Sequence, residues 1–323
     1  MKNKRMNQYR TGSLGHVYHR SHNGFVIFYN VKDCLVFFTL LMLAAEKYGI
    51  IISGLCIMYN HYHLDFEAEG PSIRRFVMNY CSRFSREYNA RYGLTGRLFD
   101  GYGLSNKNDN KARRTAYAYL YNNPVEWHIC LRAEEYMWNF LAYAIDGHPF
   151  STRIESRDMT RRLKRSMDLV SYLRSKGRPL LYGTLDTLMD CLEDKEKRYL
   201  VDWIIKEYSR IDYQRAISLY GSYDRMTDAF CNNTGSEYDI REEYDPTAGR
   251  EYKLLANCLA KDKGYKDIGD VVHRPAEERL AYLSELVVRC NVTVKHAQRF
   301  LHILEAKETD RSGIIKGDET LWC

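Results

Sequence analysis

Two histidines at alternate positions of residues 58–66, MYNHYHLDF, have the spacing of a metal site. These residues follow an apolar run rich in isoleucine, which indicates a buried strand. Because side chains alternate between the two faces of a strand, His61 and His63 are expected on one face, where two imidazoles can bind a divalent cation. The alternative to a metal site is that the two histidines are ordinary polar residues at the edge of a sheet. Asp65 is expected on the same face, as a further ligand, a partner of the ligands or a residue at the rim.

A tyrosine and an asparagine occur at helical spacing in residues 119–125, YLYNNPV. Tyr119 and Asn123 share a face of a helix, because residues four apart are neighbours. A phenol is a weak nucleophile at neutral pH and needs a metal ion and a base to attack a phosphate. Together with the histidine pair, the phenol indicates a nuclease. Tyr117 and Tyr121 are rival nucleophiles, and a packed aromatic helix face is the alternative for the whole cluster.

Both motifs resemble those of the Y1 single-strand transposases, the HUH endonucleases that include the IS200/IS605-like and REP-associated tyrosine transposases. Members of this family typically read M-P-N-H-x-H-L, then a basic helix, then Y-I-x-x-N-P-V. Here residues 58–64 read MYNHYHL and residues 119–125 read YLYNNPV, with a basic helix between them. The resemblance covers residues 12–150 and says little about residues 151–323.

The resemblance implies a transposase that cuts and rejoins single-stranded DNA, with Tyr119 as the catalytic residue that forms a 5′-phosphotyrosine. It implies His61, His63 and Asn123 as ligands of a divalent metal, Mg²⁺ or Mn²⁺. The expected partners are single-stranded or hairpin DNA and a second copy of the chain, since relatives act as homodimers or as monomers. The bond to tyrosine stores the energy for rejoining, and the chain accordingly has no G-x-x-x-x-G-K-[ST] nucleotide loop.

Two other functions are alternatives. One is a domesticated protein that binds hairpin DNA without cutting it. The intact Tyr119, Asn123 and histidine pair favour the enzyme, because a pure binding protein need not keep them. The other alternative is a replication-initiator or relaxase-like nickase, which shares the chemistry. Relaxases usually have three clustered histidines and often an appended helicase, and neither is expected here.

The excess positive charge of the chain lies in the half that carries both motifs. Residues 1–150 contain 18 Lys and Arg against 12 Asp and Glu, whereas residues 151–323 contain 30 of each. This distribution favours a polyanionic partner such as DNA. The candidates for binding nucleic acid, interleaved with aromatic residues that can stack on bases, are Arg74, Arg75, Arg83, Arg86, Arg113 and Arg114. For about half of these arginines the alternative to DNA binding is a place on a solvated helix face, with some salt bridges.

The elements that must position these residues are predicted as an α+β fold. Strands are expected at 15–20 and 24–29, followed by a helix that Asp33 caps and that ends near Gly49. The strand with the histidines comes next, and a second helix begins after Ser72. This order is typical of helices packed on an antiparallel sheet, in agreement with the ferredoxin-like fold that the resemblance implies.

Two domains are predicted, a Y1 transposase domain at 1–152 and a mostly helical, all-α region at 153–323. Residues 232–248 are expected to form an acidic loop. Residues 275–306 are expected to form two helices joined by a short turn, which allows a helix-turn-helix that reads DNA. Four polar residues of its second helix would then face outward, namely Lys295, His296, Gln298 and Arg299.

The sequence predicts neither export nor a membrane span. The N-terminal residues are basic and polar, without the apolar core of a signal peptide, and the longest apolar run, at 35–45, is too short to cross a bilayer. The nine cysteines include no C-x-x-C pair, which argues against a disulfide framework or a zinc ribbon. A cytoplasmic protein in a reducing compartment is expected.

Overall fold

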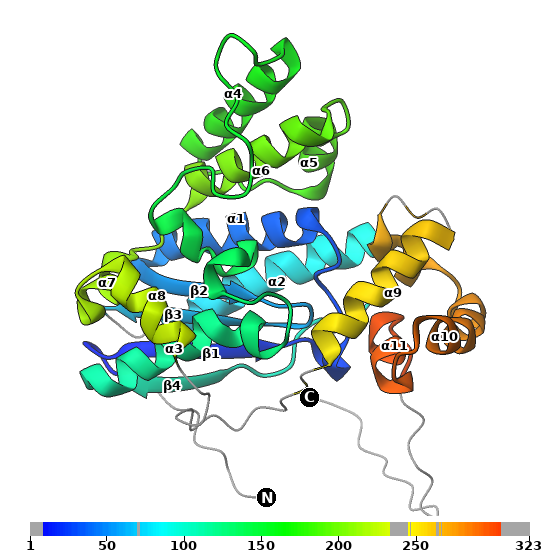
Figure 1. Ribbon diagram of the computed structural model, residues 1–323, viewed down its shortest axis with the longest axis horizontal. Coiled ribbons are helices and arrows are strands. Elements are labelled where there is room, and N and C mark those ends of the chain that lie inside the picture. Colours follow the sequence, from blue (N-terminus) through cyan, green and yellow to red (C-terminus); the bar gives the residue numbers. More distant parts are fainter. Residues whose placement is uncertain are drawn as a thin grey trace, which may run out of the picture.

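A four-stranded antiparallel sheet forms the centre of the structure, a computed structural model that describes residues 9–69, 72–232, 245, 247–262, 265 and 267–304 (Figure 1). Its strands are β1 (Leu14–Arg20), β2 (Ile50–Ile57), β3 (His61–Ala68) and β4 (Gly103–Lys107). They lie in the order β2-β3-β1-β4, and each neighbouring pair is antiparallel. This is the α+β, ferredoxin-like arrangement that the sequence predicts.

Two long helices, α1 (Val31–Tyr48) and α2 (Ile73–Tyr92), cover one face of the sheet (Figure 1). Tyr62 of β3 points toward them and is fully buried. Its ring centroid lies 4.8 Å from that of Phe37 in α1 and 6.0 Å from that of Tyr80 in α2. Because strand residues alternate, the odd-numbered residues of β3 face the opposite side of the sheet.

The beginning of α1 differs from the prediction. Its cap is Asn30, whose side chain accepts a hydrogen bond from the Asp33 amide, and the Asp33 carboxylate accepts one from the Asn30 amide in return. Asp33 is therefore the third residue of the helix in a capping box, and the prediction that it caps the helix is wrong. The helix ends at Gly49, as predicted, at a φ of 63° that glycine adopts without strain.

The Asp33 carboxylate is buried and joins three segments of the chain. It accepts hydrogen bonds from the hydroxyls of Tyr92 in α2 and of Tyr182 in α5 (Tyr182–Met189), at 2.9 and 2.8 Å. It also accepts one from the Tyr29 amide at 2.9 Å. Burial raises the pKa of Asp33 to about 7, because the loss of water penalises the charged form more than these hydrogen bonds favour it.

Asp33→Asn is expected to change how stability depends on pH. The Asp33 carboxyl keeps its proton up to about pH 7 in the native protein but loses it near its ordinary pKa of 3.8 in the unfolded chain. The free energy of unfolding of the wild type, relative to that of the variant, should therefore fall by up to ~1.4 kcal/mol per pH unit between these values and then level off. Urea denaturation of both proteins between about pH 4 and pH 8 measures this difference in the free energy of unfolding. A difference that does not change with pH would contradict the raised pKa of Asp33.

Residues 24–29, predicted as a strand, do not form one. The short 3-10 helix η1 (His22–Gly24) is followed by irregular chain, in which the amides of Ile27 and Phe28 donate to the Tyr59 carbonyl. The remaining strand of the sheet is instead β4, whose sequence GLSNK lacks the β-branched and aromatic residues typical of strands. It pairs with β1 along its whole length, so its partner determines its structure.

The other face of the sheet is covered by α3 (Asn110–Glu126), against which α7 (Gln214–Tyr220) and α8 (Tyr223–Cys231) pack (Figure 1). Asp109 caps α3, because its side chain accepts a hydrogen bond from the Ala112 amide at 2.9 Å. The odd-numbered side chains of β3 consequently lie between the sheet and this helix.

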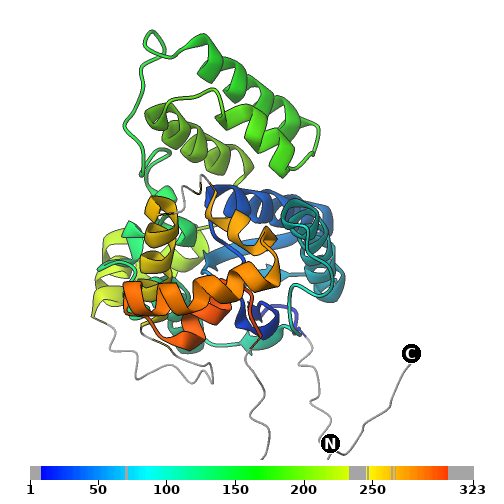
Figure 2. The same cartoon turned by 90° about the vertical axis from the view of Figure 1, so that its right-hand side faces the viewer.

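The elements of the described chain beyond residue 152 are all helices, as predicted. In addition to α5, α7 and α8 they are α4 (Arg161–Ser175), α6 (Asp194–Tyr208), α9 (Ala248–Asp262), η5 (Ile268–His273), α10 (Ala276–Cys290) and α11 (Val294–Phe300). The helices α4 to α6 form a group on the side of α1, and α9 to α11 form another beside the sheet (Figures 1 and 2). The domain boundary near residue 152 stays a prediction. The Tyr143 hydroxyl donates a hydrogen bond to the Asp202 carboxylate at 2.6 Å, so the two predicted domains are in contact. Within the described ranges, no helix is both long and apolar enough to span a membrane.

Helices α10 and α11, joined by residues 291–293, occupy the region predicted as a helix-turn-helix. His296 does not face outward as predicted, since only 2% of it is exposed. Its Nδ1 and Nε2 contact Glu251 and Asp245 at 2.8 and 2.6 Å, which ties α11 to the beginning of α9. That these helices read DNA stays a prediction. Most of the predicted acidic loop at 232–248, and residues 305–306 of the predicted motif, lie outside the described residues.

Candidate active site

The structure brings both sequence motifs together between the sheet and α3. His61 and His63 lie on the face of β3 that α3 covers, and Tyr119 and Asn123 lie on the facing side of that helix. The Asn123 amide lies between the two imidazoles, with its Oδ1 3.3 Å from His61 Nε2 and its Nδ2 3.2 Å from His63 Nε2. The Tyr119 ring meets His63 edge-on, with centroids 5.0 Å apart. The expected ligands and the expected nucleophile therefore form one cluster.

Asn60 determines which nitrogen of His61 carries the proton. The Asn60 side-chain nitrogen donates to the Gly24 carbonyl at 2.9 Å, so Asn60 Oδ1 faces His61 Nδ1, at 2.8 Å. His61 Nδ1 must donate to that oxygen, and His61 Nε2 consequently presents a lone pair to Asn123. Burial lowers the pKa of His61 to about 3, which keeps the ring in the neutral form that binds metals.

The cluster fits a divalent cation. His61 Nε2 and Asn123 Oδ1 both carry lone pairs, and they face each other at 3.3 Å. Two acceptors in this position repel each other unless a cation lies between them. Two imidazole nitrogens and one amide oxygen also leave positions for water and phosphate oxygens, as a hard cation requires. In the described part of the chain no three His, Cys, Asp or Glu side chains are placed to hold a metal, so a site here depends on the Asn123 amide.

The structure separates Tyr119 from its two rivals on α3. The Tyr121 hydroxyl donates to the Ser53 carbonyl at 3.3 Å, and its ring stacks on Phe230. Tyr117 is also buried, and the Ser53 side chain lies close to its hydroxyl. Both side chains therefore face β2, whereas the Tyr119 ring faces the histidines. Of the three tyrosines, Tyr119 is the one placed to approach a phosphate at the cluster.

The cluster is closed to solvent. His63 is fully buried, and only 6% of Tyr119 is exposed. Trp127, which follows the last residue of α3, lies against His61 with ring centroids 5.1 Å apart. The beginning of α9 packs on Trp127 so closely that a Cβ at Gly249 would lie 2.6 Å from the Trp127 carbonyl oxygen. The Tyr119 side chain therefore has little contact with solvent.

A third histidine, His16 of β1, also belongs to the cluster and is not among the predicted residues. His16 Nδ1 lies 2.7 Å from Asp65 Oδ1, and His16 Nε2 lies 3.4 Å from His63 Nδ1. His16 is therefore a third histidine next to the pair. His16 does not take the place of a third ligand, however, because it faces the edge of His63 that points away from Asn123. The sequence indicates only that His16 lies in a strand. Its position next to Asp65 depends on the pairing of β1 with β3.

The six arginines predicted to bind DNA do not gather at the cluster. Arg113 donates to the Gly12 carbonyl at 2.6 Å and pairs with Glu67 at 3.5 Å. Arg114 donates to the Leu219 carbonyl. The others lie on α2, across the sheet from the histidines, and are Arg74, Arg75, Arg83 and Arg86. The role of all six in DNA binding stays a prediction.

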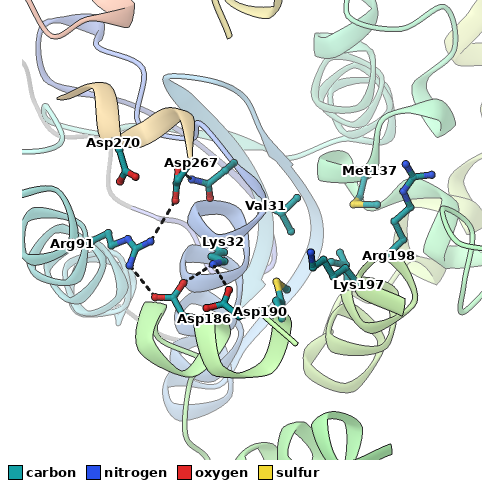
Figure 3. Close-up of a pocket in the computed structure, with 13 residues that line it drawn as sticks. Val31, Lys32, Arg91, Met137, Asp186, Asp190, Lys197, Arg198, Asp267 and Asp270 are labelled. Carbon is teal, nitrogen blue, oxygen red and sulfur yellow. Dashed lines mark hydrogen bonds and ion pairs between the residues drawn. The ribbon is translucent and has the colours of Figure 1, made fainter. Parts of the chain in front are cut away.

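A separate cavity of about 1010 Å³ lies at the beginning of α1 (Figure 3). Charged residues on its walls pair with one another: Lys32 with Asp186 at 2.5 Å, and Arg91 with Asp186 and Asp267 at 2.9 and 3.5 Å. These ion pairs join α5 and the segment before η5 to α1 and α2. The described residues that line the cavity include no histidine or tyrosine, so they do not repeat the chemistry of the cluster.

Comparisons with known proteins give one structural likeness. No protein-family model matches the chain, and no curated protein matches it. The chain is similar to a solved structure of a REP-associated tyrosine transposase bound to a REP hairpin, with 12% sequence identity and a TM-score of 0.38. The match covers 50% of this chain and 98% of the other. A likeness at this level assigns no function, which must rest on the residues of the cluster.

Proposed function

We propose that the protein is a metal-dependent endonuclease and strand transferase, a Y1-type transposase that cuts and rejoins single-stranded DNA. One observation carries the proposal: the Asn123 amide lies between the Nε2 atoms of His61 and His63, beside the Tyr119 ring. Imidazole nitrogens, an amide oxygen and a phenol in one buried cluster supply a set of metal ligands with a nucleophile next to it.

The residues of the cluster have distinct roles in the proposed reaction. His61, His63 and Asn123 would hold Mg²⁺ or Mn²⁺, which when bound polarises a phosphodiester and stabilises the charge on its oxygens. The Tyr119 oxygen attacks phosphorus, and its new bond forms as the bond from phosphorus to the 3′ oxygen of the preceding nucleotide breaks. The phenol loses its proton and the 3′ oxygen gains one. The resulting 5′-phosphotyrosine keeps the energy of the broken bond, so rejoining needs no ATP.

Single-stranded or hairpin DNA is the substrate that we infer. The half of the chain that contains the cluster carries the whole excess of positive charge. Arg74, Arg75 and Arg86 are exposed on α2 and are free to reach phosphates of a hairpin stem, although they lie across the sheet from Tyr119. A single strand also suits a closed site better than a duplex does, because it bends easily and exposes its bases. The homodimer stays a prediction.

A protein that binds hairpin DNA without cutting it is the second candidate. The burial of Tyr119 favours it, because a closed site keeps the phenol away from DNA. The orientation of His61 favours the enzyme, because a pure binding protein does not need a lone pair directed at Asn123. The relaxase-like alternative gains no support, since His16 is not placed as a third ligand.

A covalent-adduct assay separates the two candidates. Labelled single strands from both flanks of the gene, incubated with the full chain and Mn²⁺, should yield a labelled protein band that survives denaturing electrophoresis. The same strands annealed to their complements are the control and should yield none. Tight binding of a hairpin without any adduct would establish the binding protein in place of the enzyme.

A further inference from the structure

His16 and Asp65 face each other in the middle of the sheet, and both are buried. The antiparallel pairing of β1 with β3 places the two residues directly opposite each other. His16 Nδ1 lies 2.7 Å from Asp65 Oδ1, and because an ionised carboxylate can only accept, that nitrogen carries the proton. The other ring nitrogen, His16 Nε2, consequently presents a lone pair.

The lone pair of His16 points at His63. The distance from His16 Nε2 to His63 Nδ1 is 3.4 Å, and the ring centroids are 5.4 Å apart. A proton on His63 Nδ1 makes this contact attractive, whereas a lone pair there would face a second lone pair. With its proton on Nδ1, His63 directs the lone pair of Nε2 at Asn123, 3.2 Å away.

We propose that His16 and Asp65 are positioning residues that hold His63 in the tautomer and orientation of a metal ligand. Histidines that bind metals usually donate their second ring N–H to an oriented acceptor. His61 has such an acceptor in Asn60, which the backbone of Gly24 orients. His63 has one in His16, which Asp65 orients. This inference rests on the metal-dependent function proposed above, and both residues would act through His63.

The cost of this pair to the fold argues against a purely structural role. Asp65 Oδ2 is buried and, among the residues that the structure describes, has no hydrogen-bond partner. A buried carboxylate with an unsatisfied oxygen returns little stability, and apolar residues of similar volume in place of a buried polar pair are often neutral or stabilising. The double variant His16→Leu/Asp65→Leu is therefore expected to fold, while His63 loses its acceptor.

Binding of Mn²⁺ to the full chain, followed by electron paramagnetic resonance of the free ion, tests the proposal. The double variant should bind Mn²⁺ about 10- to 100-fold more weakly than the wild type, with an unchanged circular dichroism spectrum. His16→Gln should retain most of the affinity, because the glutamine amide can donate to Asp65 and accept from His63. A purely structural pair would instead lose thermal stability without a selective loss of Mn²⁺ affinity.

His16→Phe is the matched partner of His16→Gln and decides the test if the double variant does not fold. Phenylalanine fills the place of the ring but cannot accept a hydrogen bond from His63, so Mn²⁺ binding should weaken as in the double variant. Wild-type affinity in His16→Phe, or an equal loss in His16→Gln, would overturn the proposal. Failure of the proposed function gives a different result. His61→Ala would then bind Mn²⁺ as the wild type does, or the wild type would not bind Mn²⁺ at all, and both proposals would be wrong.

Discussion

Tyr119→Phe is expected to abolish the covalent adduct between the protein and single-stranded DNA. The change removes one oxygen and keeps the ring, so the edge contacts with His63 and His16, at 5.0 and 5.9 Å between centroids, can remain. Without the phenolic oxygen no phosphotyrosine forms, and the rate of adduct formation should fall by about a thousandfold or more. Initial rates on denaturing gels at saturating Mn²⁺ measure the effect, while hairpin binding should stay close to that of the wild type.

Tyr117→Phe and Tyr121→Phe are the matched controls. Each removes the same atom from a neighbouring buried ring of α3, and each should leave adduct formation near the wild-type rate, because both rings face Ser53 of β2. In Tyr121→Phe the lost hydrogen bond to the Ser53 carbonyl should lower the free energy of unfolding by about 1 kcal/mol. An adduct that persists in Tyr119→Phe but disappears in one control would assign the nucleophile to that control residue.

His61→Ala is expected to slow adduct formation by about a hundredfold or more. It removes one of the two imidazoles, and the charge stabilisation that a bound cation supplies is worth several kcal/mol. Chelation of divalent metals should slow the wild type to the same extent, because the wild type then also lacks the cation. Excess Mn²⁺ should restore the chelated wild type fully and the variant only in part.

His22→Ala is the matched control for His61→Ala. His22 lies in η1, outside the cluster, and its Nδ1 contacts Asp100 at 2.8 Å on a side chain that is 43% exposed. Its loss should change neither the rate nor the Mn²⁺ requirement. Adduct formation that continues unchanged in His61→Ala and in the presence of a chelator would contradict the assignment of the cluster as a metal site.

The centre of the cluster was predictable because its patterns are local. The alternation of β3 places His61 and His63 on one face, and helical spacing places Tyr119 and Asn123 on one face of α3. The order of strands and helices likewise indicates the α+β fold. How these two faces meet depends on tertiary packing, and the resemblance to a known family supplied that link in the prediction.

The residues that the sequence patterns do not predict are placed by contacts between distant segments. His16 reaches Asp65 only through the register of β1 against β3. The strand β4 has no strand pattern of its own and forms because β1 offers an unpaired edge. The outward orientation predicted for His296 is wrong for the same reason. Its partners Glu251 and Asp245 lie 45 and 51 residues away in the sequence, and the helical pattern of α11 does not reveal them.

The position of the DNA in the adduct tests the proposed chemistry most directly. The adduct formed by the full chain with Mn²⁺ would be digested with nuclease and protease, and the peptide that keeps a nucleotide would be sequenced by tandem mass spectrometry. We expect a single modified residue, Tyr119, linked through a 5′ phosphate. A nucleotide on Tyr117, Tyr121 or another side chain, or a linkage through a 3′ phosphate, would contradict the mechanism.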